Sequence, residues 1–147
     1  MNIARFASAL QGGDPAKSKT IFKSPKAGCV YCHKSDEEGG IVGPSLAHIS
    51  GKLNRQEILE SIILPSKRID PPYLNLTTTD GKQHSGTLVK ETAHHLTLTN
   101  AEGNQQTIPK ATIKTRQNAP SPMPAGATQS LTPQEIQHLT SYLHSLK

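Results

Sequence analysis

Two cysteines and a histidine lie close together in the segment Cys29-Val30-Tyr31-Cys32-His33, and the chain has no other cysteine. Two thiols three positions apart can each bond one vinyl group of a single porphyrin. The histidine that follows can then place its imidazole at the iron. Because thioether bonds are permanent, this CxxCH pattern predicts one covalently attached haem c.

Three other interpretations compete for these residues. A thioredoxin-like redox pair is expected at the start of a helix that follows a strand, whereas helical sequence ending at Ser24-Pro25 precedes Cys29 here. A structural zinc site would need ligands beyond Cys29, Cys32 and His33, and the sequence has no second CxxC and no HxxxH pair. A disulfide between residues three positions apart would close a very small, strained ring. The pattern therefore favours haem.

Met123 is the candidate for the second axial ligand of the iron. The only other methionine is Met1, the first residue of the chain. Met123 lies between prolines, which restrict the backbone and lower the entropy cost of holding a weak ligand. We therefore predict His33 and Met123 as the iron ligands. The rival ligands are histidines in polar sequence: His48, His84, His94 and His95.

The segment Gly43-Pro44-Ser45-Leu46 begins ten residues after His33. Turn formation alone would explain a Gly-Pro pair. Alternatively, a backbone carbonyl of this segment accepts a hydrogen bond from the free ring N–H of His33 and fixes the orientation of the imidazole.

Helices are expected on both sides of these residues. Asp14-Pro15 is typical of an N-cap followed by proline at the first helical position, and this helix ends at Ser24-Pro25. The pairs Asn54/Glu57 and Thr132/Glu135 have the spacing of a capping box, and an apolar stripe at helical spacing follows each pair.

The periodicity changes to alternation between Pro72 and Asn118, with turn signals at Asp80-Gly81 and at residues 100–103. This pattern predicts four or five short antiparallel strands that form a small curled sheet. We expect residues 1–72 and 117–147 to form the haem domain and residues 73–116 to form an inserted β unit.

The order of these features resembles a class I c-type cytochrome. The resemblance implies that the carbonyl of Pro44 accepts the hydrogen bond from His33, that Leu46 belongs to the cofactor-binding residues, and that Met123 is the sixth ligand. It also implies a mainly α cytochrome c fold, with three or more helices around the haem and a small antiparallel β insert, α+β overall. Ser18 departs from the family, in which a glycine is common at this position.

More narrowly, residues 54–69, the turn at Asp80-Gly81, Gly86 and Met123-Pro124 are similar to the PVC-type haem-binding (CxxCH) domain. Members of this group insert a small β unit between the haem motif and the methionine loop. Such domains often end large secreted proteins that also contain dehydrogenase-like propellers. The resemblance therefore implies a larger secreted parent protein and a periplasmic or otherwise extracytoplasmic location.

Composition agrees with a cofactor in the core, because hydrophobic residues make up 33% of the chain and aromatic residues 3%. The formal charge of +5 favours an acidic redox partner, although a well-solvated surface would explain the scattered basic residues equally well. The aromatic residues do not interleave with basic ones, so nucleic acid is not an expected partner. No apolar run reaches about eighteen residues, so no transmembrane segment is expected.

Residues 1–13 lack the apolar stretch of a secretory signal. We expect either that an export signal was encoded upstream and removed, or that the chain is a piece of a longer protein.

Two protein ligands would leave the iron without an open position. This arrangement favours outer-sphere transfer of one electron, and so an electron carrier, such as the electron-transfer domain of a larger dehydrogenase, rather than an enzyme. The alternative is a haem enzyme, or a gas or redox sensor, in which the sixth ligand is displaceable.

Overall fold

The computed structural model describes residues 3–41, 43–124, 126 and 128–147. The chain divides into two compact units. Residues 1–68 and 123–147 form one, called here the helical unit, and residues 69–122 form the other, called the β unit.

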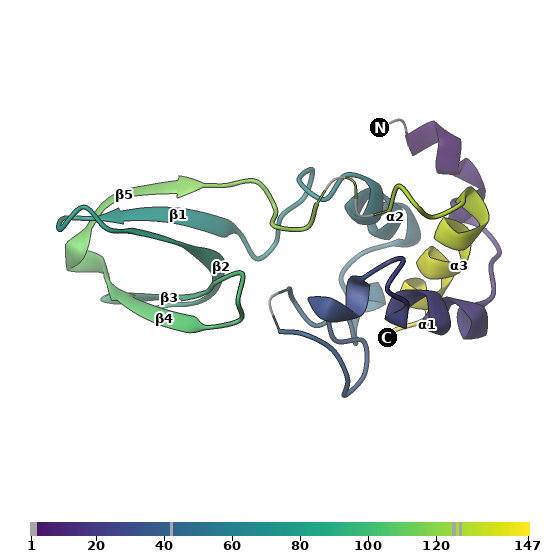
Figure 1. The fold of residues 1–147 in the computed structure, drawn as a ribbon, viewed down its shortest axis with the longest axis horizontal. Coiled ribbons are helices and arrows are strands. Elements are labelled where there is room, and N and C mark those ends of the chain that lie inside the picture. Colours follow the sequence, from purple (N-terminus) through teal and green to yellow (C-terminus); the bar gives the residue numbers. More distant parts are fainter. Residues whose placement is uncertain (1–2, 42, 125, 127) are drawn as a thin grey trace. The chain divides into compact units, whose positions relative to one another are not determined.

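The helical unit contains three α-helices and several short 3-10 segments among its described residues (Figure 1). The α-helices are α1 (Pro15–Lys23), α2 (Arg55–Ile63) and α3 (Pro133–His144). The 3-10 segments are η1 (Ile3–Leu10), η2 (Cys29–Tyr31) and η3 (Ile49–Gly51).

Side-chain caps fix where the three α-helices begin. The Asp14 carboxylate accepts a hydrogen bond from the backbone N–H of Ala16, and Pro15 occupies the first turn of α1. Asn54 and Thr132 each form a complete capping box with the glutamate three residues later. Each cap satisfies backbone N–H groups that have no partner within the helix, so each helix begins where the sequence predicts.

The core of the helical unit is built on the packing of α1 against α3. The rings of Phe22 and Tyr142 meet at a centroid distance of 5.8 Å and an interplanar angle of 56°. Ser18 is fully buried, and its hydroxyl donates to the backbone carbonyls of Asp14 and His138. A small residue is needed here, and the serine that replaces the usual glycine has its hydroxyl satisfied. The other buried apolar residues of this core are Phe6, Ala9, Ala27, Ile58, Leu59, Ile62, Ile63, Leu131, Ile136, Leu139 and Leu143.

The β unit is a five-stranded antiparallel sheet with the strand order β4-β3-β2-β1-β5. The strands are β1 (Tyr73–Thr78), β2 (Gln83–Glu91), β3 (His95–Thr99), β4 (Gln105–Pro109) and β5 (Ile113–Asn118), and the 3-10 turn η4 (Lys110–Thr112) separates β4 from β5. Leu74, Leu76, Leu96, Leu98 and Ile108 form a separate buried cluster. The β unit therefore has a hydrophobic core of its own.

The expectation of a mainly α cytochrome c fold with a small β insert is wrong, because the five strands together contain about as many residues as the three α-helices. The α-helices contain only nine, nine and twelve residues. The sheet spans residues 73–118, and its strands pair along most of that length. Because its strands pair with one another and enclose a separate hydrophobic core, this region is a substantial part of the fold rather than a minor insert.

No helix within the described residues is both long enough and apolar enough to cross a membrane.

Candidate haem-binding site

A single 3-10 turn presents the two cysteines and leads into the histidine. Gly28 precedes it with a φ of 70°, in the left-handed region that favours glycine. The carbonyl of Cys29 accepts hydrogen bonds from the backbone N–H of Cys32 at 3.2 Å and of His33 at 2.9 Å. Because one carbonyl ties both following residues to the turn, the two thiols and the imidazole belong to one local structure.

The two thiols lie in different surroundings. Cys29 is half-buried and packs with Val30 against the core of the helical unit, whereas Cys32 is exposed. Burial raises the pKa of the Cys29 thiol to about 11. The apolar side of the turn therefore keeps Cys29 neutral, while Cys32 lies at the surface.

The His33 ring makes a hydrogen bond with the backbone carbonyl of Pro44. Its Nδ1 lies 2.8 Å from the backbone oxygen of Pro44. Since a carbonyl can only accept, Nδ1 carries the proton of the neutral ring and Nε2 keeps a lone pair for a metal. Burial lowers the pKa of His33, and the hydrogen bond to Pro44 offsets part of this effect. The neutral imidazole, which is the form that ligates iron, is therefore favoured.

Glycine at position 43 makes room for the ring. A Cβ atom at Gly43 would lie 2.3 Å from Cε1 and 2.6 Å from Nδ1 of His33. Any other residue would displace the imidazole or the backbone that carries Pro44. Gly43 therefore belongs to the site as much as Pro44 does.

Two further glycines allow the loop after His33 to fold back onto the haem motif. A Cβ at Gly39 would lie 2.2 Å from the carbonyl oxygen of His33, and one at Gly40 would lie 2.1 Å from that of Tyr31. The sequence-based expectations include no role for Gly39 or Gly40, and they include Gly43 only within the segment Gly43-Pro44-Ser45-Leu46. The signal was three glycines within five residues, immediately before Pro44.

Backbone hydrogen bonds complete this fold-back. Gly40 donates to Val30 and Gly43 donates to Cys32, both at 2.8 Å. The N–H of Leu46 donates to the carbonyl of Lys34 at 2.7 Å, and the half-buried Leu46 side chain packs against the core of the helical unit. Leu46 thus anchors the end of the loop, and Cys29 packs against the same core.

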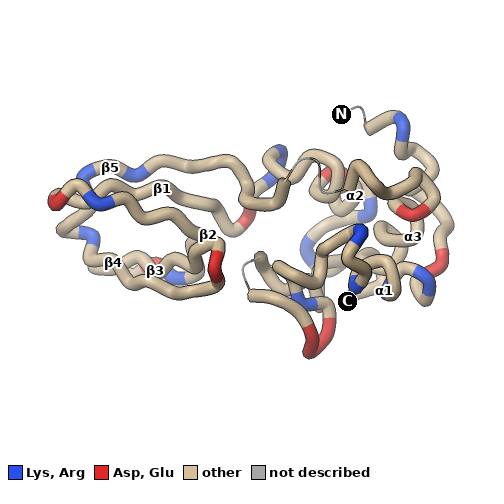
Figure 2. The backbone as a smooth tube through the Cα atoms, viewed as in Figure 1, with Lys and Arg blue, Asp and Glu red and all other residues tan. Residues whose placement is uncertain are grey.

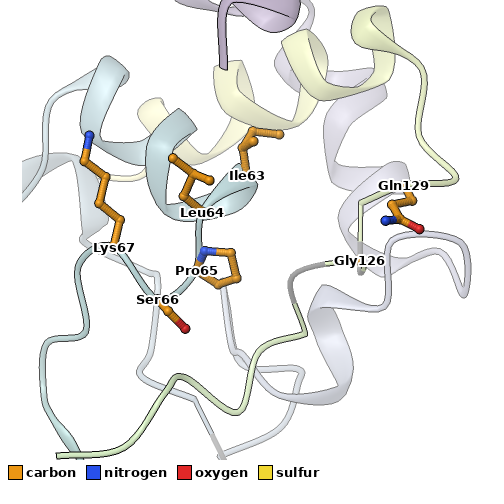
Figure 3. A pocket seen from close by; sticks show the side chains of 7 residues that line it. All are labelled: Ile63, Leu64, Pro65, Ser66, Lys67, Gly126 and Gln129. Atoms are coloured by element: carbon orange, nitrogen blue, oxygen red, sulfur yellow. The ribbon is translucent and has the colours of Figure 1, made fainter. Parts of the chain in front are cut away.

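Met123 is half-buried and belongs to the helical unit, at the start of its second chain segment. Gly126 and Gln129, which follow it, lie across an open cavity of about 390 Å³ from residues 63–67, at the end of α2 (Figure 3). Ile63, Leu64 and Pro65 make this wall mainly apolar. The helical unit thus contains His33, Pro44, Leu46 and Met123, and ligation of iron by Met123 stays a prediction.

The rival histidines have other surroundings. The Nδ1 of His48 lies 2.7 Å from the backbone oxygen of Lys147. His84, His94 and His95 belong to the β unit, where Nδ1 of His84 lies 3.1 Å from the side-chain oxygen of Gln106. Within the part of the chain that the structure describes, no three His, Cys, Asp or Glu side chains gather as a metal-binding group.

Charged residues of both signs are interspersed over each unit (Figure 2). Near the site, Lys23 lies 2.9 Å from Glu38 and 3.4 Å from Asp36, and Lys19 lies 3.4 Å from Asp36. These ion pairs connect α1 with the loop after His33. They lie at the surface, so each contributes little to stability.

Comparison with protein-family models and with curated proteins gives no match to this chain.

Proposed function

We propose that this chain is a mono-haem c-type cytochrome domain that transfers single electrons, with its haem bound through Cys29 and Cys32 and its iron ligated by His33 and Met123. The observation that carries the proposal is the hydrogen bond between His33 Nδ1 and the carbonyl of Pro44, at 2.8 Å, beside the CxxCH turn. A zinc-bound or redox-active CxxC pair would not require the adjacent histidine to be held in this way.

The residues present fit a covalent haem. One 3-10 turn places two thiols and an imidazole close together, and the lowered pKa of His33 favours the neutral imidazole. Gly43 has no side chain that would collide with the His33 ring. Cys29, Val30 and Leu46 are only partly buried against the core of the helical unit, so each keeps some apolar surface exposed to water. A large apolar ring system placed there would remove that surface from water.

The haem iron would supply the one-electron chemistry, by cycling between its ferric and ferrous states. The chain's own residues would hold the haem, orient the His33 ring and shield the haem from water. Pro44 keeps the proton of His33 on Nδ1, and Gly43 and the loop behind it fix the plane of the ring. Met123 would supply the second protein ligand to the iron, which favours electron transfer over substrate binding at the metal.

The partner is proposed to be a second redox protein, and the location to be periplasmic or otherwise extracytoplasmic, where c-type haem is attached in the family that the sequence resembles. The chain would then relay electrons from a dehydrogenase module or protein.

Covalent attachment is the decisive test. The chain is expressed in a host that exports it and attaches c-type haem, and is then extracted with acidified acetone. The haem is expected to stay with the polypeptide, and the mass is expected to increase by that of one haem.

Matched single variants Cys29→Ser and Cys32→Ser should each retain a haem bound by the one remaining thioether, and the double variant should lose it on extraction. Haem that extracts from the unaltered chain would contradict the proposal.

A further inference from the structure

A buried hydrogen bond joins the last helix to the loop that follows the haem motif. The hydroxyl of Tyr142, on α3, donates to the hydroxyl of Ser35 at 2.7 Å. Tyr142 is 6% exposed and Ser35 is 4% exposed, so water cannot substitute for either partner. Ser35 lies two residues after His33 and 107 residues before Tyr142. The contact therefore fixes a distant helix to the backbone that carries the imidazole.

Ser35 is adjacent in sequence to residues whose hydrogen bonds surround His33. The carbonyl of Lys34 accepts from Leu46 at 2.7 Å, and Pro44, two residues before Leu46, accepts from the His33 ring at 2.8 Å. A displacement of Ser35 would move Lys34 and, through Leu46, the Pro44 carbonyl. That carbonyl sets the rotation of the ring.

The Tyr142 end is rigid. Its ring packs against Phe22 of α1 at a centroid distance of 5.8 Å, within the buried contact between α1 and α3. The surface ion pairs of Lys19 and Lys23 with Asp36 also connect α1 with this loop. Those pairs are solvated and screened by salt, whereas the Tyr142–Ser35 bond lies where the dielectric constant is low. The buried bond is therefore the stronger geometric restraint.

We propose that Tyr142 is a positioning residue for His33. Its hydroxyl holds Ser35 and thereby sets the angle of the His33 imidazole plane on the iron. The role rests on the proposed function, because the ring plane acts on electron transfer only when iron is bound. Tyr142 thereby connects helix α3 to the predicted iron ligand His33, a connection that the other residues of the site do not make.

The test compares four variants of the haem-loaded protein: Tyr142→Phe, Ser35→Ala, their double variant, and Thr140→Val. Tyr142→Phe keeps the ring and its contact with Phe22 but removes the hydroxyl. Thr140→Val is the matched control, because Thr140 is also a buried residue of α3. Its hydroxyl donates to the backbone carbonyl of Ile136, within the same helix, at 2.7 Å. This substitution removes a buried hydroxyl from the same helix without a contact to the loop.

Two readouts distinguish positioning from general stability. The first is the NMR shift pattern of the haem methyl groups in the ferric state, which depends on the orientation of the axial imidazole plane. The second is the hydrogen-exchange rate of the Leu46 amide, which bonds to Lys34.

Tyr142→Phe and Ser35→Ala are expected to shift the same methyl resonances in the same direction, and to speed exchange of the Leu46 amide several-fold. The double variant should shift them no further than either single variant, because the same bond is lost in each. Thr140→Val should leave both readouts unchanged.

An unchanged methyl pattern in Tyr142→Phe, or the same shift in Thr140→Val, would overturn the positioning role while leaving the haem assignment intact. Absence of covalent haem from the unaltered chain would overturn the proposed function and this role together. If Tyr142→Phe fails to fold, Ser35→Ala decides the question by itself, since it removes the other partner of the bond.

Discussion

The Cβ position of Gly43 lies 2.3 Å from Cε1 of the His33 ring, closer than two carbon atoms can approach without displacement. Gly43→Ala should therefore push the imidazole away from its hydrogen bond with Pro44. We expect a loss of about 1–3 kcal/mol in stability, the usual cost of overpacking, and a shift of the haem spectrum toward high spin. Visible spectra and denaturant unfolding measure the two effects.

Gly51→Ala is the control for this substitution. A Cβ at Gly51 would meet no atom within 4 Å. Its stability should stay within about 0.5 kcal/mol of the unaltered chain, with an unchanged spectrum. Gly43→Ala with normal low-spin ligation would show that the ring does not need this space.

The two cysteines should react differently when the chain is made without haem. With a pKa of about 11, Cys29 has only about 1% thiolate at pH 9. Iodoacetamide should therefore label the exposed Cys32 first, and labelling of Cys29 should accelerate as the pH rises toward 11. Mass spectrometry of Cys29→Ser and Cys32→Ser separates the two rates, and faster labelling of Cys29 than of Cys32 would contradict the description of the turn.

The same shift makes the stability of the haem-free chain depend on pH. The Cys29 thiol loses its proton near pH 9.0 when unfolded and near pH 11 when folded, so the folded state binds more protons between these values. Stability should fall as the pH rises through this window, and Cys29→Ser should remove that part of the dependence.

Met123→Ala tests the sixth ligand. Loss of the thioether should remove the charge-transfer band of methionine ligation from the ferric spectrum and lower the reduction potential, because a thioether favours ferrous iron. Spectroelectrochemistry measures both. If both stay unchanged, Met123 is not the ligand, and His48 is the rival within the helical unit.

The sequence was most informative where the structure is decided locally. Asp14, Asn54 and Thr132 cap helices by contacts within three residues, so their side chains alone indicate where the helices begin. The contact between Gly43 and His33 depends on a loop that folds back onto the motif at residues 29–33. The glycines at positions 39, 40 and 43 permit this path, but they do not specify it. Tyr142 and Ser35 are 107 residues apart, and no local sequence pattern indicates that their hydroxyls form a hydrogen bond.

The error in fold class came from the resemblance to a mainly α family, because alternation indicated strands over nearly the same residues that form the sheet. What alternation does not set is the length of each strand, and the length of β2 depends on its partner. Lys90 and Glu91 stay extended because they pair with Thr97 and Leu96 across a register shift. Pairing between strands, rather than the pattern of any one of them, determines how much of the chain is sheet.

In the β unit, Glu91 should control the response to acid. Hydrogen bonds with Arg116 and then Lys110 lower the pKa of Glu91 from 4.5 to about 2. A lowered carboxyl pKa contributes stability that is present above pH 4.5 and is lost as the pH falls toward 2. Glu91→Gln should therefore flatten the acid unfolding of this unit, followed by the methyl resonances of Leu96 and Leu98.

Glu102→Gln, in the exposed turn between β3 and β4, serves as the control and should keep the acid dependence of the unaltered chain. Equal acid dependence in Glu91→Gln and the unaltered chain would mean that the ion pairs of Glu91 do not stabilise the sheet.

The β unit should be removable without loss of the haem. Residues 69–122 have their own buried cluster, and the first and last strands of the sheet pair with each other, Leu74 opposite Asn118. The backbone N–H of Ala119 also donates to the carbonyl of Tyr73 at 2.8 Å.

Because the two ends of the unit lie side by side, a short Gly/Ser bridge can replace it at the small entropy cost of closing a short loop. We expect the bridged chain to attach haem and to keep the spectrum of methionine ligation. Haem incorporation, the ferric spectrum and electron exchange with a small-molecule reductant are the measurements. Loss of haem attachment would mean that the β unit is required to form the site, whereas a retained spectrum with slower exchange would assign the unit a role in the approach of the electron donor.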